Sequence, residues 1–278
     1  GIETIFALPG AQLDPMFGAL YQARESLRVI HTRHEQGTSY MAFGYAQSTG
    51  KVGVNLVVPG PGLLNASAGL STAYACGAPV LCLAGQIPSK LIGQGIGQLH
   101  ELSDQPGAVA SVTKWRGRAD TPSDAPGKVR EAFQQLNTGR VQPVLLEMAP
   151  DIMASRGDVE LLAPIACYDG IDPEPDEDLI EQAAVLLGNA EHPAIMIGGG
   201  IWGAEESLLN LAEEIQAPVC TSPHGNGAID ARHYLAQNLM CAKEDWDNID
   251  VVLSVGTRYQ APASWGQHHG KKLIRIDI

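Results

Sequence analysis

Short apolar runs of strand length alternate with segments of helical pattern, and this alternation constrains the fold more than any other feature of the chain. The runs in the first half include TIFALPG, SLRVIH, VGVNLVVPG, APVLCLAG and PVLLEMAP. They are rich in Val, Leu and Ile, and several end in Gly or Pro, as buried parallel strands do where they meet loops. The segments between them predict helices near Asp14–Ser26, Gly37–Thr49, Gly62–Ala75 and Pro126–Thr138. This order predicts a doubly wound α/β domain with a mostly parallel sheet.

A second unit of the same class follows a change in composition. The stretch GDVELLAPIACYDGIDPEPDED is rich in Pro and acidic residues and predicts an extended linker over 154–176, which separates domains at 1–153 and 177–278. Beyond it come helices DLIEQAAVLLGNA and AEESLLNLAEEI and strands PAIMIGGG, APVCTS, DVVLSVG and KLIRIDI. Because the chain starts at Gly1 without methionine and stops in a strand at Ile278, we expect a fragment whose second domain is truncated.

Charge and cysteine content narrow the classes of partner. The net charge of −13 argues against binding to nucleic acid or to an anionic membrane surface, since both require clustered Lys and Arg. No signal peptide opens the chain, and no apolar run approaches the roughly 20 residues that span a bilayer. The odd number of cysteines and the absence of a C-x-x-C pair favour a reducing compartment, so we expect a cytoplasmic protein. The cysteines are Cys76, Cys82, Cys167, Cys220 and Cys241.

A G-x-G-x-x-G pattern lies between the predicted strand PAIMI and the helix that follows. It comprises Gly198, Gly199, Gly200 and Gly203. Binding of a nicotinamide dinucleotide would require an acidic residue at the end of the next strand, but that strand ends in Cys220, Thr221 and Ser222. The pattern therefore favours a tight strand-to-helix turn that faces a different ligand, with a nicotinamide dehydrogenase kept as an alternative.

Other short motifs match catalytic signatures only in part. NASAG has Asn65 where a nucleophile elbow needs its first Gly, and it lies inside a predicted helix. His100 and Glu101 lack the second histidine of a zinc H-E-x-x-H motif, so we predict no metal site in this chain.

Three turns are expected to meet in one crevice. They contain Pro9 and Gly10, Glu35, and Gly60-Pro61-Gly62, each at the end of a predicted strand. Open α/β sheets bind ligands outside the carboxyl ends of their strands, so these turns define the candidate site. Taken alone, Glu35 could equally be a carboxylate favoured by the positive end of a helix.

Four ordered motifs carry a family resemblance. GIETIFALPG, RHEQG with FGYA, GPGLLN and LIGQGIGQ occur in the order and approximate spacing of thiamine diphosphate-dependent enzymes. The second half, from HPAIMIGGG to KLIRIDI, is similar to the central domain of these enzymes. The chain most resembles the acetolactate synthase branch. The resemblance implies a pyrimidine-binding domain of the thiamine diphosphate-binding fold, followed by a Rossmann-like central domain.

The resemblance also implies roles for particular residues. Glu35 aligns with the glutamate that hydrogen-bonds N1′ of the aminopyrimidine and promotes its imino tautomer. Apolar neighbours at Val29, Ile30, Met41 and Phe43 are expected to desolvate this carboxyl. Other positions are implied to border the cofactor, namely Pro9, Gly10, Ala11, Gly60, Pro61, Gly62 and Asn65.

On the substrate side the chain departs from the acetolactate synthase pattern. Gln98 aligns with a glutamine near the reacting centre, but His100 and Glu101 follow where that branch usually has Gln-Glu. Phe43 also replaces the commoner Asp before GYA. These departures are compatible with a different decarboxylase or carboligase that acts on a 2-oxo acid. In such an enzyme His100 is a candidate acid or base on the substrate side. The alternative is that His100 caps a helix or faces solvent.

The remaining expectations concern cofactors and assembly. The resemblance implies thiamine diphosphate, with Mg²⁺ held by a diphosphate-binding domain absent from this chain, and a homodimer or homotetramer with its active site between chains. The fragment alone is therefore expected to be inactive. FAD is a further candidate near Gly198–Gly203 and GTRYQAPASWG, although the usual charged residues after GTR are replaced. A non-catalytic nucleotide- or flavin-binding module, regulatory or structural, is the rival function.

Overall fold

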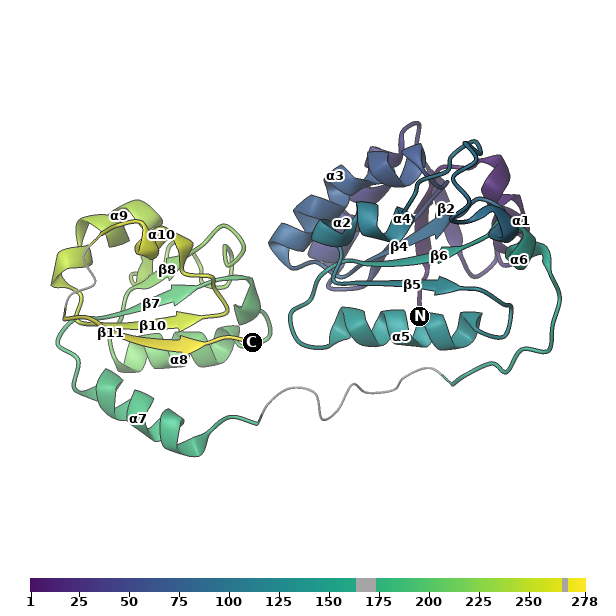
Figure 1. The fold of residues 1–278 in the computed structure, drawn as a ribbon. Helices are drawn as coiled ribbons and strands as arrows, with labels where there is room; N and C mark the ends of the chain where they lie inside the picture. The colour runs from purple at the N-terminus through teal and green to yellow at the C-terminus, as the bar shows by residue number, and fades with distance from the viewer. Residues whose placement is uncertain (164–173, 267–269) are drawn as a thin grey trace. The chain divides into compact units, whose positions relative to one another are not determined.

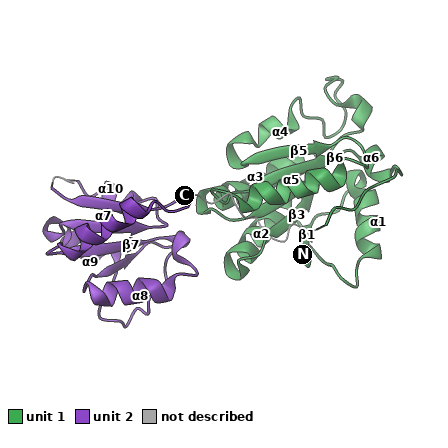
Figure 2. Ribbon diagram, turned by 90° about the horizontal axis from the view of Figure 1, so that it is seen from below, with its two compact units in different colours: residues 1–172 green, residues 173–278 purple. Residues whose placement is uncertain are grey.

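The computed structural model describes residues 1–163, 174–266 and 270–278. It divides the chain into two compact units, residues 1–172 and 173–278 (Figure 2). Each unit is built on one sheet of parallel strands with helices between them, which confirms the predicted α/β class. Part of the predicted linker, including Cys167, lies outside the described residues. Nothing in the described part is a helix long and apolar enough to cross a membrane.

The first unit is a sheet covered by helices on both faces (Figure 1). Its strands are parallel and lie in the order β2-β1-β3-β4-β6-β5. In chain order the elements are β1 (Thr4–Ala7), α1 (Asp14–Gln22), β2 (Arg28–His31), α2 (Glu35–Thr49), β3 (Gly53–Val57), α3 (Pro61–Cys76), β4 (Val80–Gly85), α4 (Gln105–Ala108), β5 (Trp115–Ala119), α5 (Ala125–Asn137), β6 (Val144–Met148) and α6 (Pro150–Ala154).

Alternation along the strands divides this unit's core into two layers. Phe6 points to the α2 and α3 side with Leu63 and Leu70, whereas Ile5 points to the other side. There α5 contributes Leu136. Successive side chains of a strand face opposite sides of the sheet, so apolar residues at neighbouring positions bury both faces at once.

The second unit repeats the architecture with a smaller sheet, ordered β11-β10-β7-β8-β9. Its elements are α7 (Glu177–Gly188), β7 (Pro193–Ile197), α8 (Glu205–Glu214), β8 (Val219–Thr221), β9 (Ala236–Gln237), α9 (Leu239–Glu244), β10 (Val251–Val255), α10 (Gln260–Ala263) and β11 (Lys272–Ile276). Leu208 and Ala212 of α8 pack on one face, and Trp246 packs on the other.

The structure adds elements that the apolar pattern did not predict. β5 has the sequence WRGRA and forms the edge of the sheet beside β6, and its charged residues hide it from a search for apolar runs. β9, with two residues, is too short to leave a pattern. α2 begins at Glu35, two residues before the predicted start at Gly37, because His34 caps it: Nδ1 of His34 accepts a hydrogen bond from the Gln36 amide at 3.1 Å.

Candidate functional site

Three of the predicted turns lie at one edge of the first unit's sheet. β2, β1 and β3 are neighbours and run parallel, so the segments that follow them emerge at the same edge. Pro9, Gly10 and Ala11 follow β1, Glu35 follows β2, and Gly60 follows β3. The order of the strands thus brings together residues that lie more than 20 positions apart in the sequence.

Glu35 meets Asn65 at this edge. It occupies the first turn of α2 and is half-buried, and Asn65 lies one turn into α3. Nδ2 of Asn65 donates a hydrogen bond of 3.0 Å to Oε2 of Glu35. On the other side, a methyl group at Gly62 would lie 3.4 Å from Oε1 of Glu35. One oxygen of the carboxylate is therefore held by an amide, and the other faces a position without a side chain.

Close packing of α2 on α3 makes this contact reachable. A methyl group at Gly69 of α3 would lie 2.3 Å from Oγ of Ser39 and 2.7 Å from the backbone nitrogen of Tyr40. Only glycine permits this approach of the two backbones. Because both helices begin at the same sheet edge, their first turns come within hydrogen-bonding distance, and Asn65 reaches Glu35.

The predicted apolar wall around Glu35 is not formed as expected. Val29 packs into the layer that contains α5, whereas Ile30 packs against the layer of α2 and α3, because neighbouring strand residues point to opposite faces. Phe43 packs in the latter core, and Met41 is 40% exposed. These four side chains therefore do not share one environment around the carboxyl.

The turn after β3 is pressed against His100. Gly60 has φ +59° and ψ −116°, and a methyl group on it would lie 2.5 Å from the carbonyl oxygen of His100. Nδ1 of His100 lies 2.5 Å from Nε2 of Gln12, which directly follows the Pro9-Gly10-Ala11 turn. The structure thus places His100 between the segments that follow β1 and β3. Sequence reasoning missed Gln12, although a polar residue beside a predicted ligand-binding turn was a usable signal.

Gln98 is held by its backbone. The carboxylate of Glu101 accepts hydrogen bonds of 2.9 Å from the amides of Gly95 and Gln98, and so ties the loop into a tight turn. Gln98 is half-buried, whereas Ile96 and Leu99 of the same loop are exposed. The backbone of Gln98 is thereby joined to Glu101 in both directions, since the amide of Glu101 also donates to the carbonyl oxygen of Gln98 at 2.8 Å.

Two buried polar residues beneath the site left no sequence signal. Gln105 lies at the start of α4 and Glu147 lies within β6, and they are 1% and 0% exposed. Glu147 sits inside an apolar run, where a single carboxylate does not break the strand pattern. Only the fold shows that the two side chains contact each other, with Nε2 of Gln105 2.6 Å from Oε2 of Glu147.

The glycines of the second unit form a turn made of backbone contacts. The segment Gly198–Gly203 passes from β7 through a short 3-10 turn toward α8. The amide of Gly200 donates to the carbonyl of Gly256 at 3.1 Å, and Nε1 of Trp202 donates to the carbonyl of His224 at 3.1 Å. Gly198, Gly199 and Gly200 therefore bring segments of the second sheet close together at its carboxyl edge.

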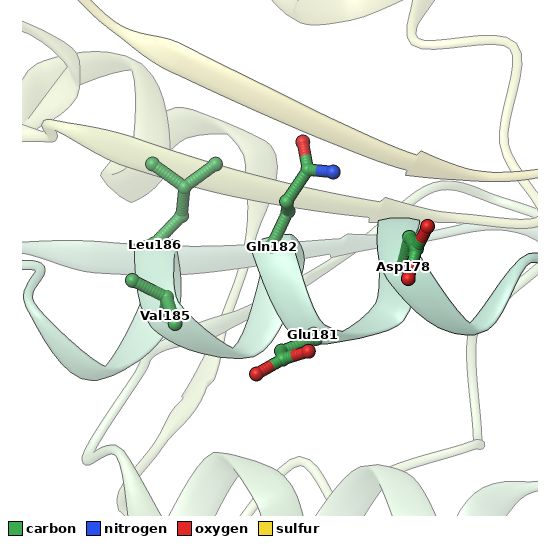
Figure 3. A pocket seen from close by; sticks show the side chains of 5 residues that line it. All are labelled: Asp178, Glu181, Gln182, Val185 and Leu186. Atoms are coloured by element: carbon green, nitrogen blue, oxygen red, sulfur yellow. The ribbon is translucent and has the colours of Figure 1, made fainter.

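One surface depression lies in the second unit. It has a volume of about 530 Å³ and is lined by Asp178, Glu181, Gln182, Val185 and Leu186, all from α7 (Figure 3). A groove along one helix offers no polar groups converging from different elements, as ligand sites usually do. We therefore place the candidate site at the edge of the first sheet. Within the described ranges, no three His, Cys, Asp or Glu side chains gather closely enough to hold a metal ion.

Comparison with known proteins identifies the class to which this architecture belongs. Residues 1–108 match the N-terminal thiamine pyrophosphate-binding domain of thiamine pyrophosphate enzymes, and residues 180–278 match their central domain. The chain therefore belongs to the thiamine pyrophosphate enzyme family. Both domains follow in the order that the resemblance implied.

Individual relatives carry more than one activity in their names. The chain is 35% identical to a probable acetolactate synthase large subunit of Methanocaldococcus jannaschii and 33% identical to an acetolactate synthase of Arthrospira platensis. It is 32% identical to a probable 2-ketoarginine decarboxylase of Pseudomonas aeruginosa. Each match covers 100% of this chain but only 49%, 51% and 50% of the respective relative. The chain thus spans about half the length of the curated relatives it matches.

Proposed function

We propose that this chain forms the pyrimidine-binding domain, residues 1–153, and the central domain, residues 177–278, of a thiamine diphosphate-dependent enzyme. The whole enzyme decarboxylates a 2-oxo acid and releases or transfers the resulting acyl group, as its relatives named acetolactate synthase and 2-ketoarginine decarboxylase suggest. The single observation that carries the proposal is the contact of Glu35 with Asn65 at the edge where the turns after β1, β2 and β3 meet.

The residues at this edge fit an aminopyrimidine ring. Gly60 and Gly62 let the turn after β3 pack closely against the backbone of His100 and the side chain of Val58, and Glu35 presents one carboxylate oxygen beside Gly62. When bound, thiamine diphosphate supplies a thiazolium carbon acid whose conjugate base adds to the carbonyl carbon of the substrate. Glu35 is assigned to share a proton with N1′ of the pyrimidine, which is general acid–base work for a carboxylate. Asn65 orients that carboxylate through its amide.

The substrate side is assigned to the loop that precedes α4. His100 is the candidate proton donor or acceptor, and Gln12 holds one of its ring nitrogens. The hydrogen bond to Gln12 leaves Nε2 of His100 to face the substrate, a division of roles typical of catalytic histidines. Gln98 contributes an amide, and Glu101 holds the backbone around it.

Assembly and further cofactors complete the proposal. Tyr40 and Met41 within α2 and Leu64 in the first turn of α3 are exposed apolar residues. A second copy packed over these two helices would bury them and would desolvate the carboxyl of Glu35, which one chain leaves half-buried. We assign a homodimer or homotetramer on this basis. Mg²⁺ is assigned to a diphosphate-binding domain in the whole protein, and FAD is a candidate ligand of the glycine turn after β7. A cytoplasmic location stays a prediction.

The decisive test is exchange of the cofactor's C2 proton in the whole protein. Replacing Glu35 by Gln keeps the size of the side chain but removes its basicity, so C2 exchange and decarboxylation of a panel of 2-oxo acids should fall roughly 100- to 10,000-fold. Glu25→Gln, which changes an exposed carboxylate of the same unit, serves as the matched control. If Glu35→Gln exchanges as fast as the wild type, the assignment is wrong.

A further inference from the structure

We propose that Gln105 is a positioning residue that holds the turn after β3 in the shape required for the cofactor. It acts through a buried hydrogen-bonded network anchored by Glu147 and Arg118. The link to the cofactor rests on the proposed function. The contact between Gln105 and the turn is a property of the protein alone.

The side-chain amide of Gln105 joins two parts of the unit. Its Oε1 accepts a hydrogen bond of 2.8 Å from the amide of Gly60. Its Nε2 donates to the carbonyl oxygen of Gly85, at the end of β4, at 2.9 Å and to Oε2 of Glu147 at 2.6 Å. A single amide therefore connects the turn after β3 to the ends of β4 and β6.

The partners determine which way this amide points. The group of Gly85 that meets Gln105 is its carbonyl oxygen, and Glu147 accepts from Gln105 with Oε2 while its Oε1 accepts from Nε of Arg118 at 2.6 Å. Because both neighbours are acceptors, Nε2 of Gln105 faces them and Oε1 is left to face Gly60. Arg118 and Glu147 are paired positions on adjacent strands, so the sheet itself anchors the network.

The buried amide of Gly60 needs a hydrogen-bond acceptor from outside the turn, and Gln105 provides it. Gly60 has a backbone conformation outside the ordinary regions and packs against the carbonyl of His100, and residues 58–60 are buried. A buried amide without a partner costs free energy, so loss of the Gln105 carbonyl favours another arrangement of the turn. Movement of this turn would shift both the start of α3, which carries Asn65, and the wall formed by His100. Gln105 thereby controls the site without contacting the ligand.

The test combines two replacements of Gln105 in the whole protein with a readout that needs no cofactor. Gln105→Leu removes every hydrogen bond of the side chain, and Gln105→Glu places a second carboxylate against Glu147 and Gly85. In both variants, hydrogen exchange of the apo protein, followed by mass spectrometry, should show at least roughly tenfold faster exchange at Gly60. Thiamine diphosphate should bind roughly tenfold more weakly in the presence of Mg²⁺.

A compensating double variant separates positioning from general destabilisation. In Gln105→Glu with Glu147→Gln, the new glutamine can donate to the new carboxylate and accept from Arg118, so part of the Gly60 protection and of the cofactor affinity should return. Gln86→Leu is the matched control, because Gln86 is buried beside the same carboxylate at 3.5 Å but makes no hydrogen bond to the turn. It should leave exchange at Gly60 within about twofold of wild type.

Specific results would overturn the inference. Wild-type exchange at Gly60 in Gln105→Leu would show that the turn does not depend on this side chain. If Gln105→Leu fails to fold, the single and double Glu variants decide, and a double variant no better than the single one refutes the network. If wild-type protein with Mg²⁺ does not bind thiamine diphosphate, the proposed function fails while the exchange result at Gly60 still stands or falls separately.

Discussion

The two units share an architecture but differ in what lies at the carboxyl edge of the sheet. In the first unit, side chains from distant segments meet there, such as Glu35 with Asn65 and Gln12 with His100. In the second unit, the segment after β7 meets the segment after β10 mainly through backbone, with Gly200 donating to Gly256. A parallel sheet therefore determines where a site can form, but the side chains delivered to that edge determine its chemistry.

The units also differ in how they place their charges. Glu147 is fully buried and paired with Arg118, whose side chain is 31% exposed. In the second unit, Glu213 pairs with His233 but is itself 48% exposed. When one partner of a buried ion pair is removed, no water is present to solvate the charge that remains. Removing a carboxylate should therefore destabilise the first unit more than the second.

The largest difference is expected for loss of these two carboxylates. Glu147→Ala removes the carboxylate that pairs with Arg118 and leaves Gln105 with only the Gly85 carbonyl as acceptor, so it should lower the free energy of unfolding of the first unit by about 3 kcal/mol. Glu213→Ala should cost the second unit about 0.5 kcal/mol or less. Denaturant unfolding followed by hydrogen exchange in peptides of each unit measures both values. Equal losses in the two units would contradict the comparison.

A smaller difference is expected for methyl groups added to helical glycines. Gly69→Ala forces α3 away from Ser39 and should destabilise the first unit by about 1–3 kcal/mol. Gly188, at the end of α7, has no atom within 4 Å of the added methyl, so Gly188→Ala should be neutral or stabilising by up to about 1 kcal/mol. Thermal unfolding of each variant distinguishes these signs. A neutral Gly69→Ala would mean that the two helices can separate without loss.

The smallest effect concerns one carboxylate in each unit. Burial raises the pKa of Asp250, but hydrogen bonds from the amides of Glu191 and His192 outweigh it and lower the pKa below its ordinary value. The pKa of Asp151 is lowered in the same way, because the backbone amide and the hydroxyl of Ser89 both donate hydrogen bonds to its carboxylate.

The sign of the resulting pH dependence follows from these lowered values. Each ionised group stabilises its unit above the unfolded pKa of about 3.9, and this contribution is lost as pH falls through the folded value. We therefore expect wild-type protein to lose more stability than Asp250→Asn or Asp151→Asn between about pH 5 and pH 3. Unfolding curves at these pH values provide the measurement. Parallel curves for variant and wild type would show that the hydrogen bonds contribute nothing.

Much of the fold was predictable because its signals are local. Apolar runs identified β1, β2, β3, β4 and β6, since buried parallel strands need continuous apolar sequence. β5 was missed because edge strands tolerate charged residues such as Arg116 and Arg118. The apolar wall around Glu35 was predicted from nearness in sequence, and strand alternation placed Val29 and Ile30 on opposite faces.

By itself, the sequence determined the class of fold, the two-unit order and the turns that end at one sheet edge, because hydrophobic period and glycine or proline position act over a few residues. Only the tertiary structure decided that Asn65 holds Glu35, that Gln12 meets His100, and that Gln105 joins Gly60 to Glu147. These pairs are separated by 30 to 88 positions. Their contacts depend on strand order and on the close packing of helices, which no local pattern encodes.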